Sequence, residues 1–162
     1  MPARVSTVLL LLCAALAVVG ACSSGPQRLS AEQFADQANT ACGQARTDLE
    51  ALDPVDVGDP MAAAETVERT TEIQREMRSR LDELHPPAAG DGTYDEWIRQ
   101  IDVVLEQSEQ LASALRTGDA AGQTEANQRG DQAVTAAAAA AVELGADECV
   151  DQVTSTQSPI VP

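Results

Sequence analysis

The chain has few of the residues on which large cores and many active sites depend. Aromatic residues make up 2% of its 162 residues, namely Phe34, Tyr94 and Trp97, and His85 is its one histidine. Much of the 44% hydrophobic content is alanine, which buries little surface per residue. A chain of this length with so few large side chains predicts a single domain with a thin hydrophobic core.

Sequence motifs of several common enzyme classes are also absent. The chain has no phosphate-binding glycine loop, no G-x-S-x-G turn and no H-E-x-x-H motif. A triad or dyad that needs an imidazole base could use only His85. His85 follows a predicted helix, where a cationic side chain is favourable near the helix dipole and the last carbonyls. We therefore expect no enzymatic activity, no catalytic residue and no cofactor.

Positive charge is scarce, and its scarcity limits the partners. The chain has 26 acidic residues and 10 basic ones, all of them arginine. Such a surface repels nucleic acid and the anionic headgroups of a membrane. We expect no nucleic-acid partner, and we expect any membrane attachment to depend on a lipid and not on a basic patch.

The acidic residues raise the question of calcium binding. Three clusters have carboxylates close together in the sequence: Asp53, Asp56 and Asp59; Asp91, Asp95 and Glu96; Asp147, Glu148 and Asp151. None of them has the ligand spacing of an EF-hand loop. Helix capping and the first helical turn explain several of these residues, since both favour acidic side chains. We expect no metal site.

The N-terminus has the three parts of an export signal. Residues 1–5 carry one charge, residues 8–21 are uninterruptedly apolar, and residues 23–26 end that pattern. The apolar run is shorter than the roughly 20 residues that a membrane-spanning helix needs. Residues 1–21 are therefore predicted to be a cleaved signal peptide.

Val19-Gly20-Ala21-Cys22 resembles the lipobox of bacterial lipoproteins, in which the cysteine is linked to diacylglycerol. By that resemblance Cys22 is the lipidation site and the mature N-terminus, and residues 22–29 form a lipidated end and a short linker. The protein is then expected on the outer, extracytoplasmic face of the cell membrane. The alternative is cleavage by the ordinary signal peptidase, whose small-residue rule Val19 and Ala21 also satisfy, which would give a secreted protein.

Two further cysteines remain in the mature chain. Cys13 would be lost with the signal, which leaves Cys42 and Cys149 in a compartment where disulfides form. A structural disulfide between them is the favoured interpretation. The alternatives are a reactive thiol and a pair of metal ligands, although neither cysteine has a second Cys or a His at the spacing of zinc sites.

Hydrophobic periodicity predicts four helices, over residues 31–52, 60–84, 94–117 and 120–144. Ser30 with Gln33, and Thr93 with Glu96, fit capping boxes. Asp59 and Asp119 are the expected caps of the second and fourth helices, and Gly118 is expected to end the third. The residues expected to face the core are Phe34, Ala38, Cys42, Ala45, Leu49 and Leu52; Met61, Ala64, Val67, Ile73, Met77, Leu81 and Leu84; Trp97, Ile101, Val104, Leu111 and Leu115; and Ala126, Gly130, Ala133, Ala137, Ala140 and Leu144.

Similar helix lengths and short connections favour an all-α, up-down-up-down four-helix bundle over residues 30–150, followed by a disordered tail over residues 151–162. In that bundle Cys42 lies about 16 Å from the start of the first helix. A disulfide to Cys149 therefore requires one of two arrangements: the chain after Gly145 folds back over the bundle, or the first helix begins later than Ser30.

The chain is similar to a loosely defined, uncharacterised group of small helical lipoproteins and secreted proteins of actinobacteria. The resemblance covers most of residues 30–150 and rests on these features: Phe34, Asn39 and Cys42; Leu81 to Leu84 followed by His85-Pro86-Pro87-Ala88; Trp97; Arg116-Thr117-Gly118-Asp119; and Leu144-Gly145 with Cys149. It implies a helical bundle with this cysteine pair, and it implies no activity.

Two functions fit these expectations. The first is a non-catalytic scaffold or accessory module of the cell envelope, held by the lipid on Cys22 and binding an unknown envelope protein. The alternative is a carrier of a small apolar ligand or lipid, in a groove left by the small side chains of residues 120–144. A carrier needs a pocket of about 300 Å³ or more.

Overall fold

The computed structural model describes residues 27–54 and 58–150. Over these residues the fold is all-α: α1 is Ala31–Glu50, α2 is Pro60–Asp82, η1 is Ala88–Gly90, α3 is Asp91–Thr117 and α4 is Ala120–Glu143. The predicted fold class and the four long helices are confirmed, with ends within three residues of the expected ones. None of the described helices is long and apolar enough to span a membrane. The predicted signal, Cys22 and the tail over residues 151–162 lie outside the described residues.

Three of the helix starts follow from local side-chain chemistry. The Ser30 hydroxyl accepts a hydrogen bond from the Gln33 amide at 3.2 Å, and the Gln33 side chain accepts one from the Ser30 amide at 3.1 Å, so this capping box is confirmed. Asp59 caps α2 through the Met61 amide at 2.9 Å. Asp119 caps α4 through the Gly122 amide at 3.0 Å.

The start of α3 differs from the prediction. The helix begins at Asp91, directly after η1, and its N-cap Gly90 makes no side-chain hydrogen bond. The capping box predicted for Thr93 and Glu96 is wrong, because Pro87 leads into the short 3-10 helix and the chain is already helical before Thr93. The Thr93 hydroxyl instead lies 3.4 Å from a carboxylate oxygen of Glu143 in α4.

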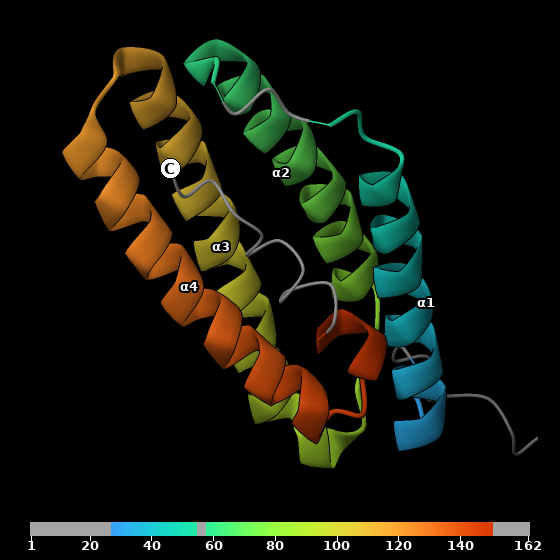
Figure 1. The fold of residues 1–162 in the computed structure, drawn as a ribbon. Helices are drawn as coiled ribbons and strands as arrows, with labels where there is room; N and C mark the ends of the chain where they lie inside the picture. Colours follow the sequence, from blue (N-terminus) through green and yellow to red (C-terminus); the bar gives the residue numbers. More distant parts are fainter. Residues whose placement is uncertain (1–26, 55–57, 151–162) are drawn as a thin grey trace, which may run out of the picture.

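The helices run alternately up and down, as Figure 1 shows, and they pack in chain order: α1 on α2, α2 on α3, and α3 on α4. The backbones of α1 and α4 do not approach within 8 Å between Cα atoms, although both helices contribute residues to one core cluster. The chain after Gly145 folds back and forms a helical turn over residues 147–150, seen in dark red beside α1. We call residues 146–150 the closing turn. Of the two arrangements expected from the cysteines, the fold-back is the one observed, and Ser30 remains the cap of α1.

The closing turn is joined to α1 by the predicted disulfide, which is confirmed. Cys42 and Cys149 are bonded with their Cα atoms 5.1 Å apart, and both are buried. Asn39 strengthens the junction, since its side chain donates to the Gly145 carbonyl at 3.3 Å and accepts from the Glu148 amide at 3.0 Å. Gly145 has a φ of +74°, which lets the chain reverse direction after α4.

The core consists of two clusters of unequal size. The larger one, which we call the cystine half, contains the disulfide and most of the large buried side chains: Phe34, Ala38, Ala41, Cys42, Ala45, Met77, Leu81, Tyr94, Trp97, Ile98, Ile101, Leu105, Ala137, Ala140, Ala141, Ala146 and Cys149. The smaller one, which we call the hairpin half, lies near the turn between α3 and α4 and contains Ala63, Ala64 and Leu115, with Val67 and Leu111 packed against them.

Three buried polar side chains, which we call the polar layer, lie between the two clusters along α2 and α3. They are Thr71 and Gln74 on α2 and Gln107 on α3. The side-chain carbonyl oxygens of Gln74 and Gln107 have no hydrogen-bond partner within the described residues. The hydrophobic pattern does not predict the burial of these residues, and it places Met61 in the core. Met61 is 50% exposed, because it lies in the first turn of α2 at the edge of the hairpin half.

Candidate functional site

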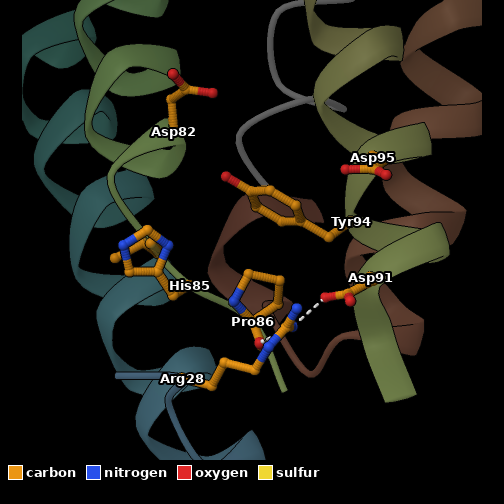
Figure 2. A pocket seen from close by; sticks show the side chains of 8 residues that line it. Arg28, Asp82, His85, Pro86, Asp91, Tyr94 and Asp95 are labelled. Atoms are coloured by element: carbon orange, nitrogen blue, oxygen red, sulfur yellow. Dashed lines mark hydrogen bonds and ion pairs between the residues drawn. The ribbon is translucent and has the colours of Figure 1, made fainter. Parts of the chain in front are cut away.

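One pocket of about 390 Å³ lies at the end of the bundle where α2 stops, α3 starts and the chain enters α1 (Figure 2). It is lined by Arg28, Asp82, Leu84, His85, Pro86, Asp91, Tyr94 and Asp95. We call residues 27–30 and 84–91 the tether end of the bundle, because the chain from Cys22 arrives there.

Tyr94 forms a wall of the pocket and links α3 to α2. Its hydroxyl donates a hydrogen bond to the Leu81 carbonyl at 2.6 Å, and its ring meets that of Phe34 edge to face at 5.7 Å. Burial, with a smaller contribution from the nearby Asp82 charge, raises the pKa of Tyr94 to about 12. The phenol is therefore neutral at physiological pH and remains a hydrogen-bond donor.

Tyr94 thus has the capping role that the sequence suggested for His85. The imidazole of His85 is exposed, and within the described residues its ring makes no hydrogen bond to the last carbonyls of α2. It is the backbone carbonyl of His85 that forms a hydrogen bond: it accepts one from the Leu29 amide at 2.9 Å. The prediction assumed a helix to residue 84, whereas α2 ends at Asp82, so His85 lies three residues beyond it.

Arg28 closes one side of the pocket. Its guanidinium donates to the Pro86 carbonyl at 3.0 Å and forms an ion pair with Asp91, both drawn as dashed lines in Figure 2. The hydrogen bond to Asp91 raises the pKa of the Arg28 guanidinium above its ordinary value. Together with the Leu29 amide, these contacts hold the segment before α1 against the turn between α2 and α3.

The remaining carboxylates come from both walls. Asp82 at the end of α2 pairs with Arg78 at 3.2 Å, whereas Asp95 lies on the α3 side of the pocket. The lining has charges of both signs and one aromatic ring, but no nucleophile paired with a base. Over residues 27–54 and 58–150, no group of three or more His, Cys, Asp or Glu side chains is arranged to hold a metal ion. The lining also includes Leu84 and Pro86, so the pocket has both polar and apolar walls, and its volume exceeds the roughly 300 Å³ that a carrier needs.

The predicted site residues lie in different places. Cys22 is outside the described residues, and the Cys42–Cys149 disulfide lies in the core and not in the pocket. Of the acidic clusters, Asp91 and Asp95 line the pocket, Glu148 forms an ion pair with Arg46 at 2.7 Å, and Asp56 and Asp151 fall outside the described residues. No residue of α4 lines the pocket, so it is not the groove expected beside the small side chains of that helix.

Sequence reasoning missed Arg28 and Tyr94. Arg28 was placed in the linker, and its partner Asp91 is 63 residues away in the sequence, so no local pattern connects them.

Comparisons of the chain with protein-family models, with curated proteins and with solved structures found no match.

Proposed function

We propose that this protein is an extracytoplasmic lipoprotein, anchored through Cys22, that acts by contact with another protein of the cell envelope. The observation that carries the proposal is the buried Cys42–Cys149 disulfide, since such bonds form and persist in oxidising compartments outside the cytosol. The disulfide supports export, and the lipobox at residues 19–22 supports anchoring.

The pocket supports a contact role more than a catalytic one. Several of its polar groups are already bound within the protein: Arg28 to Asp91 across the pocket, and Asp82 and Tyr94 to Arg78 and the Leu81 carbonyl of α2. General acid–base or nucleophilic catalysis needs a group poised toward a substrate, with a base within hydrogen-bond reach. The arrangement stabilises the end of the bundle instead.

Anchoring is tested by replacing the lipidated residue. The wild-type protein, produced in a bacterium that lipidates its own lipoproteins, should enter the detergent phase, and its N-terminal peptide should carry the mass of diacylglycerol. Cys22→Ala should move to the aqueous phase, because a domain with this acidic surface has no other strong membrane attachment. Ser23→Ala is the matched control and should behave as wild type. Unchanged partitioning of Cys22→Ala would contradict the anchor, and a wild-type protein in the aqueous phase would support secretion.

The contact role is tested on native membranes. Chemical cross-linking of the tagged protein should give a discrete adduct with one envelope protein, and Cys22→Ala should lose it because the domain is no longer held at the membrane. Native mass spectrometry of the same preparation separates this role from the carrier alternative. A co-purified apolar molecule in stoichiometric amount would favour the carrier and contradict the scaffold.

A further inference from the structure

We propose that the lipid anchor holds the bundle with its tether end against the bilayer, so that the turn between α3 and α4 points away from the membrane. This inference rests on the proposed function, since it requires a lipid on Cys22. The surface that meets the membrane consists of residues 27–30 and 84–91. Its partner is a layer of phospholipid headgroups.

The contacts of the segment before α1 fix where the anchor joins the bundle. The Leu29 amide donates to the His85 carbonyl at 2.9 Å, and Arg28 is bound to both Pro86 and Asp91. The half-buried Leu29 also packs against the core of the cystine half. The chain is therefore tied to the turn between α2 and α3 before it enters α1, and free linker can exist only before Arg28.

The length of that linker limits the orientations. Six residue steps separate Cys22 from Arg28, and at about 3.3 to 3.6 Å per residue they reach roughly 20 Å. Helix α3 alone has 27 residues, which makes it about 40 Å long at 1.5 Å per residue. The linker is thus too short for the bundle to invert and place the α3–α4 turn on the membrane while Arg28 stays bound at the opposite end.

Charge disfavours the remaining alternative, in which the bundle lies on its side. The chain carries 26 acidic residues against 10 basic ones, so a long flank on an anionic surface is repelled. The turn at residues 86–90 is uncharged, although Glu83 and Asp91 border it. Contact through one end of the bundle brings fewer acidic residues to the surface than contact along a flank, and the short linker decides which end makes that contact.

Energy transfer to the membrane tests the orientation. A donor dye is placed on the lipidated full chain at Ala89→Cys, at the tether end, or at Ala121→Cys, in the first turn of α4; both positions are exposed. The oxidised Cys42–Cys149 pair and the lipidated Cys22 do not react with the label. On phosphatidylcholine–phosphatidylglycerol vesicles with acceptor dye on the headgroups, transfer should be several-fold stronger from position 89. Equal transfer from both positions, or stronger transfer from position 121, would overturn the proposal.

A pair of adjacent variants tests how much the contacts of Arg28 add to the orientation. Arg28→Ala removes the ion pair with Asp91 and the hydrogen bond to Pro86 but leaves the Leu29 amide bound to His85, so the linker gains one residue and the difference between the two labels should shrink only slightly. Gln27→Ala is the matched control and should keep the wild-type difference, since Gln27 is exposed one residue earlier. Loss or reversal of the difference in Arg28→Ala would overturn the proposal, because the remaining linker of about 25 Å is still too short to invert the bundle.

Mass spectrometry of the vesicle-bound protein separates this inference from the function on which it rests. If the N-terminal peptide lacks diacylglycerol, the proposed anchor fails and the orientation fails with it. If diacylglycerol is present and both labels transfer equally, the anchor stands and only the orientation is overturned.

Discussion

The two halves of the bundle are built from different side chains. In the cystine half Phe34, Leu81, Trp97 and the disulfide are all at most 2% exposed, whereas the hairpin half depends on two alanines and Leu115. Because the free energy gained on burial scales with apolar area, the cystine half contributes most of the stability. The strong half is also the half to which residues 28 and 29 are bound, so the tether end is the more stable one and the end at the α3–α4 turn is the more easily opened.

The largest effect should come from breaking the disulfide that defines the stronger half. Replacing Cys42 and Cys149 together by alanine opens a loop of 107 residues, and in the chain-entropy model a loop of about 100 residues is worth about 4.7 kcal/mol of unfolding free energy. Urea denaturation measures the loss. Hydrogen exchange should show that α1 and the closing turn lose protection first, because the disulfide joins them. Loss of protection confined to the α3–α4 turn would contradict this division into halves.

Matched truncations in the two clusters compare them directly. Trp97→Ala removes the largest fully buried side chain of the cystine half and should cost about 3 to 5 kcal/mol. Leu115→Ala in the hairpin half should cost about 2 kcal/mol, at the low end of such substitutions, since fewer atoms surround it. Both are measured by urea denaturation with the disulfide intact. A larger loss for Leu115→Ala would reverse the ranking of the halves.

The parts of the fold that the sequence predicted are those decided within a few residues. Ser30 and Gln33 sit three positions apart, and Asp59 and Asp119 bond to amides two and three residues on, so each cap is visible locally. Gly118, with a φ of +66°, marks the end of α3 for the same reason. The capping box predicted for Thr93 was wrong although its spacing to Glu96 is correct. The chain that follows the two prolines becomes helical earlier, at Asp91.

The parts that the sequence did not predict depend on distant residues. The burial of Gln74 and Gln107 depends on how the helices pack, with Gln107 lying against Gly130 of α4, whereas an isolated glutamine on a helix predicts exposure. The pocket combines residues from positions 28, 82–86 and 91–95, which become neighbours only after the bundle forms. The cysteine pair could be predicted because counting left only two candidates.

A substitution in the polar layer should raise the unfolding free energy, whereas the substitutions above lower it. Gln107→Leu replaces a buried carbonyl oxygen that lacks a partner and keeps a similar side-chain volume, so it should raise the unfolding free energy by about 1 kcal/mol. Gln128→Leu on the exposed side of α4 is the control and should change it by less than about 0.5 kcal/mol. A destabilised Gln107→Leu would show that this oxygen is satisfied in solution, for example by a bound water.

An effect of similar size and opposite sign concerns the Tyr94 hydroxyl, which joins the two walls of the pocket. Tyr94→Phe removes the hydrogen bond to the Leu81 carbonyl and should cost about 1 kcal/mol at neutral pH. Since burial raises the pKa of Tyr94 to about 12 from an ordinary value of 10, the neutral phenol is the form that the folded state prefers. Its contribution is therefore complete below pH 10, declines as the pH rises from 10 to 12, and is lost above 12.

Tyr94 is the only tyrosine in the chain, so the ultraviolet absorbance of tyrosinate reports this one group. Its titration midpoint should lie near 12 in the folded protein and near 10 in urea. The unfolding free energy of the wild type should fall more steeply than that of Tyr94→Phe between pH 10 and 12, because only the wild type must keep the phenol protonated in order to stay folded. A folded-state midpoint near 10 would mean that the hydroxyl is open to water, and the cystine half would then be less tightly closed at its tether end than the burial of Tyr94 implies.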